Sequence, residues 1–161
     1  MIIKNAEKSE IEEILRVYEE AKCFMRKNGN NLQWINGYPS IDTVLKDLED
    51  NNLYVIKDNN EIVGVFTLII GIDPNYLKID GKWLNDDAYG ALHRVASNFK
   101  VKGILNEAVL YAFNQINNLR IDTHEVNIPM QKAIEKLKFQ KCGIIHLISD
   151  GTPRIAYQKV R

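Results

Sequence analysis

The chain has 161 residues, enough for one domain with a sizeable buried core. Lysine plus arginine and aspartate plus glutamate number 21 each, and this balance argues against a general nucleic-acid-binding protein, which needs a basic surface. The two cysteines, Cys23 and Cys142, lie far apart without metal-ligand spacing, so they predict neither a disulfide framework nor a zinc site.

No stretch of the chain predicts insertion into a membrane. The N-terminal residues lack the apolar core of a signal peptide, and the longest apolar run, residues 62–72, is too short to cross a bilayer. We therefore expect a cytoplasmic protein with no membrane partner. Because no linker-like or low-complexity composition interrupts the chain, residues 1–161 are expected to form a single domain.

The first part of the chain predicts a short strand followed by two helices. Residues 1–5 are expected to form the strand. Ser9 followed by Glu12 is a capping-box pattern, and the apolar residues after it recur at helical spacing up to a turn at residues 27–31. Beyond a loop with two aromatic residues, Ser40 is placed to cap a second, shorter helix.

The chain then changes to the period of strands. Residues 53–57, a polar turn and residues 62–70 predict an antiparallel hairpin whose second strand is almost entirely apolar. Gly64 within that strand indicates a bulge. Residues 73–87 form a polar and aromatic connection, and connections of this length are usually functional or mobile.

A strand, a basic turn and a helix form the centre of the second half. Residues 89–96 predict the strand, and residues 100–117 place apolar side chains on one helical face. Lys100, Lys102 and Gly103 stand at the entrance of this helix. Unpaired N–H groups and the positive end of the helix dipole suit a phosphate there, although a basic turn of this kind is more often only solvated surface.

The last part of the chain predicts three strands and one helix. Asn127 with Pro129 begins the helix. The strands are expected at residues 120–123, 139–148 and 154–159, with an Asp-Gly turn before the last one.

This order of elements and two sequence segments resemble the GNAT superfamily of N-acetyltransferases. The family's loop [Q/R]-x-x-G-x-[G/A] corresponds to residues 100–105, where only Gly103 fits strictly. Residues 127–139 are similar to the family's N-x-x-A-x-x-x-Y-E-K-x-G-F, with Ile134 in place of the tyrosine and Lys138 in place of the glycine. The resemblance implies an α/β (α+β) fold with a mixed, mostly antiparallel sheet of about seven strands flanked by about four helices.

The resemblance also implies that acetyl-CoA donates its acetyl group to a primary amine, which attacks directly within a ternary complex. The 100–106 loop and the helix N-terminus would hold the pyrophosphate, and backbone N–H groups of the preceding strand would hold the acetyl carbonyl. The residues expected at the cofactor are Val95, Ala96, Lys100, Val101, Lys102, Gly103, Ile104, Leu105, Asn106 and Asn127. No metal site is expected.

Two histidines are candidates for the general base, which is needed because an alkylamine with a pKa of about 10.4 is protonated at neutral pH. His93 lies on the strand before the central helix, and strict alternation puts it on one face with Val95. His124 follows the next strand, where Asp122 is placed to orient its imidazole. Either histidine can instead be a structural, hydrogen-bonded residue.

Aromatic residues in three parts of the chain are candidates for the acceptor pocket: Trp34, Tyr38, Tyr76, Trp83 and Tyr89. For those on loops, the commoner role is to anchor the loop to the core. The acceptor is expected to be a small-molecule amine or a protein amine, and the sequence leaves the oligomeric state open, a homodimer included.

Two other functions compete with acetyl transfer. Ile134, in place of the family's acid tyrosine, and Leu105, which could crowd a phosphate, motivate an acyl-CoA-binding domain with little or no catalytic activity. A nucleotide-binding α/β domain of another family would need a run of parallel strands, which the antiparallel hairpin at residues 53–70 disfavours.

Overall fold

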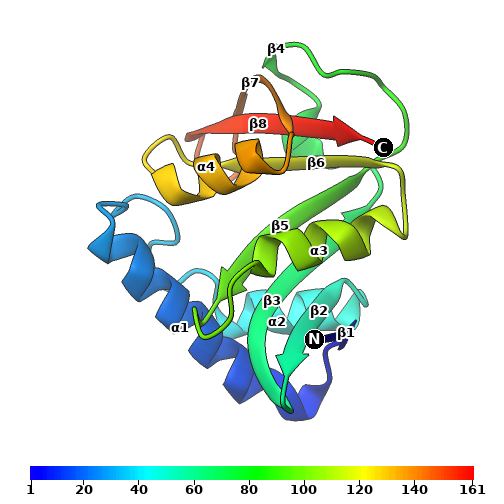
Figure 1. Ribbon diagram of the computed structural model, residues 1–161. Coiled ribbons are helices and arrows are strands. Elements are labelled where there is room, and N and C mark those ends of the chain that lie inside the picture. The colour runs from blue at the N-terminus through cyan, green and yellow to red at the C-terminus, as the bar shows by residue number, and fades with distance from the viewer.

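A computed structural model describes residues 1–161 as one eight-stranded sheet with four α-helices around it (Figure 1). The strands are β1 (Ile2–Asn5), β2 (Leu53–Asp58), β3 (Glu61–Ile70), β4 (Asp80–Gly81), β5 (Gly90–Ser97), β6 (Asn118–Thr123), β7 (Gln140–His146) and β8 (Pro153–Val160). The helices are α1 (Ile11–Lys27), α2 (Ile41–Glu49), α3 (Ile104–Phe113) and α4 (Ile128–Lys136), with short 3-10 turns η1 (Lys8–Glu10) and η2 (Pro74–Tyr76). The predicted fold class is confirmed, and the eighth strand is the two-residue β4 within the 73–87 connection.

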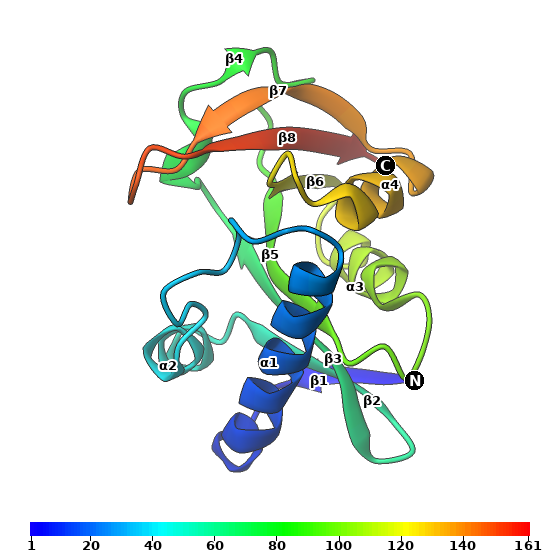
Figure 2. The ribbon, with the colours of Figure 1, turned by 90° about the vertical axis from the view of Figure 1, so that its left-hand side faces the viewer.

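The sheet has the order β1-β2-β3-β5-β6-β8-β7-β4 and only one parallel pair, β5 with β6. That pairing ends at Leu92 opposite Ile121, although β5 continues to Ser97. The two strands therefore diverge beyond Leu92, as Figure 2 shows. The predicted hairpin is the antiparallel pair β2 and β3, and its register is irregular beside Gly64, as expected of a bulge.

Each face of the sheet has its own apolar core. Helices α3 and α4 bury one face, which we call the α3 face, in a cluster that includes Leu92, Ala108, Ile121, Ile134 and Tyr157. Helices α1 and α2 cover the other, the α1 face, in a cluster that includes Ile14, Tyr18, Val44, Val65 and Ala96. A third, smaller cluster lies under the 73–87 connection.

A bulge in β5 breaks the expected alternation of its side chains. The register with β3 shifts between Val65 opposite Ala96 and Thr67 opposite His93, and Arg94 has a positive φ of 49°. The side chains of His93 and Arg94 consequently both lie on the α1 face, where they contact Asp73 and Asp47, whereas Val95 packs against the α3-face core. The prediction that Val95 shares a face with His93 is wrong, because alternation cannot anticipate an inserted residue.

Two predicted helix starts also differ from the structure. The reciprocal cap before α1 joins Glu7 and Glu10 rather than Ser9 and Glu12, because the 3-10 turn η1 precedes the helix. The Glu7 N–H donates to Glu10 Oε1 over 2.9 Å. The central helix begins at Ile104, so residues 100–103 form a loop that leads into it.

Gly64 leaves the space into which the start of α3 fits. A Cβ built on this glycine would lie 2.7 Å from Cγ2 and 3.1 Å from Cδ1 of Ile104. The bulged strand β3 thus sets how closely α3 approaches the sheet.

Both cysteines are free thiols, and no group of three or more potential metal ligands comes together. None of the helices combines the length and the apolar character that spanning a membrane would require.

Candidate active site

A cavity of about 940 Å³ opens where β5 and β6 diverge. Its walls come from the α1–α2 loop, the end of β3 with η2, the strands β5 and β6, the start of α4 and the β7–β8 loop. Leu92 and Val95 contribute from the α3 face of β5, and His93 and Arg94 from the α1 face. Residues from both faces of the sheet therefore contribute to the cavity wall.

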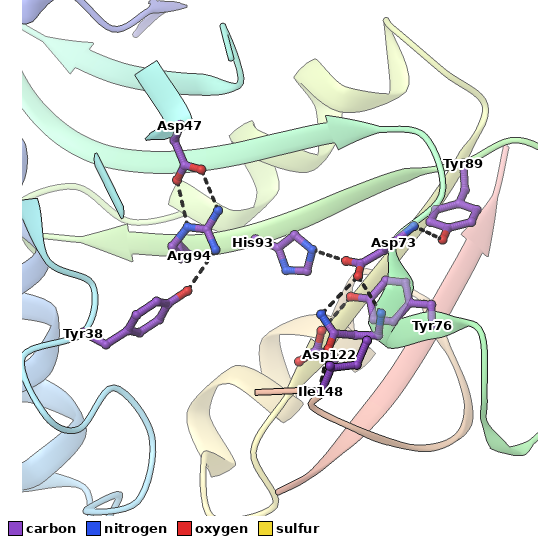
Figure 3. A network of polar contacts seen from close by, with 10 residues as sticks. Tyr38, Asp47, Asp73, Tyr76, Tyr89, His93, Arg94, Asp122 and Ile148 are labelled. Carbon is purple, nitrogen blue, oxygen red and sulfur yellow. Dashed lines mark hydrogen bonds and ion pairs between the residues drawn. The ribbon is translucent and has the colours of Figure 1, made fainter. Parts of the chain in front are cut away.

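His93 is held on the cavity wall by Asp73, which follows β3. Its Nε2 lies 2.7 Å from Asp73 Oδ2, and the histidine and aspartate side chains are only 18% and 8% exposed (Figure 3). An ionised carboxylate only accepts hydrogen bonds, so Nε2 carries the proton and Nδ1 is the basic nitrogen of the neutral ring. This arrangement suits a general base.

Asp73 is fixed by three further contacts. Its Oδ1 accepts hydrogen bonds from the backbone and side-chain N–H groups of Asn75 over 2.9 and 3.1 Å, as the N-cap of η2. Its own N–H donates to the Tyr89 hydroxyl over 2.7 Å. Burial raises the pKa of the Asp73 carboxyl, but the hydrogen bond and charge of His93 and the Asn75 donors outweigh burial, so the pKa lies below its ordinary value.

A second polar group lies beside the histidine on the bulge. Arg94 forms a two-pronged ion pair with Asp47 of α2 and donates from Nη1 to the Tyr38 hydroxyl over 2.9 Å. Figure 3 shows this chain of contacts running from α2 to the α1–α2 loop. The ion pair and the Tyr38 contact together hold the bulge next to His93.

Five of the predicted site residues line the cavity: Trp34, Tyr38, His93, Val95 and Asn127. Trp34 is also packed edge-on against Tyr18 with ring centroids 5.6 Å apart. Asn127 caps α4 by accepting from the Met130 N–H over 3.2 Å, as predicted for the start of that helix.

Three predicted pocket aromatics do not line the cavity. Tyr76, Trp83 and Tyr89 are buried together in the cluster under the 73–87 connection, with Arg120 stacked 4.0 Å from the ring centroids of both Trp83 and Tyr89. Burial and the neighbouring Asp122 raise the pKa of Tyr76, whose hydroxyl donates to Asp122 over 2.6 Å. Their positions agree with the alternative role of loop anchors.

His124 is also outside the cavity lining. It is buried, and its Nδ1 accepts a hydrogen bond from the Val126 N–H over 3.1 Å. Asp122 does not orient it, because that carboxylate accepts from Tyr76 instead. Burial, and then the charge of Arg154, lower the pKa of His124, so the neutral ring is favoured.

The entrance of α3 lies on the α3 face, apart from the cavity lining. Gly103 caps the helix with a left-handed φ of 84°, and no side chain caps the first turn. Lys100 forms an ion pair with Glu61, whereas Lys102 is exposed and unpaired. Leu105 packs against the α3-face core, so its side chain leaves the helix entrance open.

The family's tyrosine position carries no titratable group here. Ile134 is fully buried in the α3-face core. Lys138, in the family's glycine position, has a left-handed φ of 69° just after α4.

Sequence reasoning missed several polar residues of the cavity wall, among them Asp73, Arg94 and Arg154. Asp73 had a usable signal, because Asp-Pro-Asn is typical of a helical N-cap. Arg94 is a charge inside an apolar strand, which can indicate a bulge. Arg154 gave no signal that separates it from a surface residue at the start of a strand.

Comparison with solved structures identifies the fold. A GNAT family acetyltransferase from Streptococcus agalactiae 2603 is 32% identical, with a TM-score of 0.87 over 99% of this chain and 95% of that one. A putative acetyltransferase from Staphylococcus aureus Mu50 is 23% identical, with a TM-score of 0.73 over 99% of both chains. A ribosomal-protein-alanine N-acetyltransferase from Brucella melitensis is 17% identical, with a TM-score of 0.62 over the whole of both chains.

Neither protein-family profiles nor curated protein sequences give a match. The structural similarity at 32% identity extends over almost the entire chain. The chain therefore belongs to the GNAT family of acetyltransferases.

Proposed function

We propose that the protein is an acetyl-CoA-dependent N-acetyltransferase in which a primary amine attacks the thioester directly within a ternary complex. The observation that carries the proposal is the His93–Asp73 pair, 2.7 Å apart on the wall of a cavity beside the point where β5 leaves β6. A base in that position is what an amine acceptor needs, because only its neutral form is a nucleophile.

The residues at the entrance of α3 fit a pyrophosphate. The first turn of the helix presents backbone N–H groups without a capping side chain, and Gly103 supplies a conformation that few other residues adopt. Lys102 adds an unpaired positive charge. On the same face, the buried Thr123 hydroxyl on the cavity wall has no partner within the protein and is free to bond the amide-containing arm of the coenzyme.

In this proposal His93 removes the proton from the amine through Nδ1, and Asp73 holds the ring by its Nε2–H. The imidazolium that results is stabilised by the Asp73 carboxylate. Beyond Leu92, β5 has no partner strand on its β6 side. The N–H groups of Val95 and Ala96 are proposed to polarise the acetyl carbonyl in this segment.

A second candidate function is coenzyme binding with little or no catalysis, and the burial of Ile134 favours it. With no acid in that position, the coenzyme thiolate leaves unprotonated or takes its proton from water. A thiol pKa of about 8.5 makes this a tolerable leaving group, so acyl transfer remains the leading proposal.

The acceptor is proposed to be a primary amine, on a small molecule or on a protein such as the ribosomal protein named for the Brucella melitensis neighbour. A cytoplasmic location is proposed with it, since acetyl-CoA is a cytoplasmic metabolite.

Two measurements test the proposal. Isothermal titration with acetyl-CoA measures coenzyme binding, and release of the coenzyme thiol in the presence of an amine panel measures transfer. Tight binding with amine-dependent thiol release supports the enzyme. Tight binding without release for any amine favours the binding domain, and absence of binding rejects both.

A further inference from the structure

Arg154 is a buried cation on the cavity wall without an anionic partner. The residue is 8% exposed and lies at the start of β8, next to the end of β6. Its only hydrogen bonds come from Nη1, which donates to the Thr152 hydroxyl over 3.0 Å and to the Pro153 carbonyl over 2.9 Å. These contacts fix one nitrogen of the guanidinium and leave Nε and Nη2 without protein acceptors.

The two carboxylates whose charges act on Arg154 are engaged elsewhere. Asp122 accepts from the Tyr76 hydroxyl, and Asp150 accepts from the N–H and hydroxyl of Thr152. Neither forms an ion pair with Arg154. Burial lowers the pKa of the guanidinium, and the charges of Asp122 and Asp150 only partly oppose this effect.

Arg94, the other arginine of the cavity wall, has the carboxylate partner that Arg154 lacks. It is paired with both oxygens of Asp47. A buried charge without such a partner is costly, and a planar guanidinium matches a carboxylate in particular. The missing partner of Arg154 is therefore expected to arrive with a ligand.

We propose that Arg154 binds a carboxylate of the acceptor, and that the acceptor is an amine of the α-amino acid class. This inference rests on the proposed N-acetyltransferase function and names its substrate class. Arg154 and His93 line the same cavity, and Asp122 pairs with Ala156, two residues from Arg154 on β8. Asp122 is bonded to Tyr76, whose ring centroid is 6.0 Å from that of His93. A carboxylate on Arg154 thus leaves the amine on the side of the base.

Half of the residues that line the cavity are hydrophobic, and several of these are exposed. Leu32, Ile35, Ile72 and Ile148 line it and are between 46% and 77% exposed, from three separate segments of chain. An amino acid with an apolar side chain matches these walls better than a polar one.

The test compares acceptors that differ only in the carboxylate: L-phenylalanine, L-phenylalaninamide and 2-phenylethylamine, with 2-aminoethyl phosphate as a phosphorylated amine. Wild-type protein is expected to show a kcat/KM for phenylalanine at least about tenfold above that for each analogue. The amine of the amide is less basic than that of phenylalanine, and the amine of 2-phenylethylamine is more basic, so a preference for the acid over both analogues cannot follow amine basicity.

Variants of the arginine test its role directly. In Arg154→Gln the ratio of kcat/KM for phenylalanine to that for 2-phenylethylamine is expected to fall towards one, mainly through KM for phenylalanine. Arg154→Lys is expected to retain part of the preference, because lysine keeps the positive charge but cannot donate two parallel hydrogen bonds to a carboxylate. Arg16 is an exposed arginine on α1 without an ion pair, so Arg16→Gln is the matched control and should keep the wild-type ratio.

The outcomes separate this inference from the proposed function. Suppose that acetyl-CoA binds, but that the amines without a carboxylate, or the phosphorylated amine, are acetylated with the same kcat/KM as phenylalanine. Only the inference then fails. It also fails if no carboxylated amine is acetylated, or if Arg154→Gln keeps the preference. If acetyl-CoA does not bind, the proposed function itself is wrong. The wild-type panel decides the matter even if a variant does not fold.

Discussion

Arg94 on the bulge of β5 and Asp47 on α2 are joined by two hydrogen bonds of 2.8 Å, from Nε to Oδ2 and from Nη2 to Oδ1. The side chains are only 16% and 7% exposed, and the Thr67 hydroxyl also donates to Asp47 over 2.9 Å. The pair links α2 to the strand residue next to His93. It therefore stabilises both the packing of the α1 face and the position of the base.

Replacing Arg94 by methionine should leave Asp47 buried without its counter-charge. We expect Arg94→Met to lower the free energy of unfolding by about 3–5 kcal/mol. The double variant Arg94→Met/Asp47→Leu should recover most of that loss, since no buried charge remains. Urea denaturation of the three proteins checks this, and a loss below about 1 kcal/mol in the single variant would contradict it.

Gly64 and Ile104 are expected to be coupled. Alanine at position 64 places a Cβ against Ile104 Cγ2, and we expect Gly64→Ala to destabilise the fold by about 1–3 kcal/mol. In an Ile104→Ala background the same substitution meets no clash and should cost less. A double-mutant cycle measures the coupling energy, and strictly additive effects would rule out this contact as the reason for the glycine.

Lys138 adopts a left-handed conformation that glycine adopts without strain. We expect Lys138→Gly to raise the free energy of unfolding by about 0.5–1 kcal/mol, net of the entropy that glycine adds to the unfolded chain. Lys132→Gly, at an exposed position within α4, should instead destabilise by about 1 kcal/mol. Equal effects of both substitutions in chemical denaturation would be inconsistent with strain at Lys138.

His124 should make stability depend on pH. Its pKa is lowered in the folded protein, so between that pKa and the unfolded value of about 6.5 the unfolded chain binds more protons and acidification destabilises the fold. His124→Asn keeps an acceptor for the Val126 N–H but cannot titrate. The variant should therefore gain stability relative to wild type as pH falls from about 7.5 to about 5, measured by urea denaturation; a constant difference would exclude the effect.

Much of the fold could be predicted because periodic apolar patterns dictate which faces are buried. The hairpin of β2 and β3, the central helix and the cap of α4 by Asn127 all follow from local sequence. The start of α1 and the faces of β5 could not be predicted in this way, because a 3-10 turn precedes the helix and a bulge inserts one residue into the strand. A periodic apolar pattern does not predict where a residue is inserted.

The candidate site was harder to predict because its partners lie far apart in sequence. His93 could be named from its strand, but its partner Asp73 is 20 residues away and is positioned by the 73–87 connection. Tyr76 and Trp83 of that connection were predicted to line the acceptor pocket. In the structure they are buried in a core cluster, and Arg120 stacks on Trp83. An aromatic side chain that lines the pocket can be told from one that anchors the loop only when the side of the sheet that the connection covers is known.

Asp73 is expected to act through His93 rather than on the substrate. Asp73→Asn removes the charge that stabilises the imidazolium while leaving an acceptor oxygen in place. We expect kcat to fall by about tenfold or more, with the dissociation constant of acetyl-CoA unchanged. A kcat within about threefold of the wild-type value would show that Asp73 has only a structural role.

The role of His93 as general base is tested most directly by His93→Ala. With an amine that the wild type acetylates, single-turnover and steady-state rates should be measured alongside titration with acetyl-CoA. We predict a fall in kcat of about 10²- to 10⁴-fold with coenzyme affinity retained. A variant that binds acetyl-CoA normally and transfers the acetyl group within about threefold of the wild-type rate would contradict the assignment of His93 as the base.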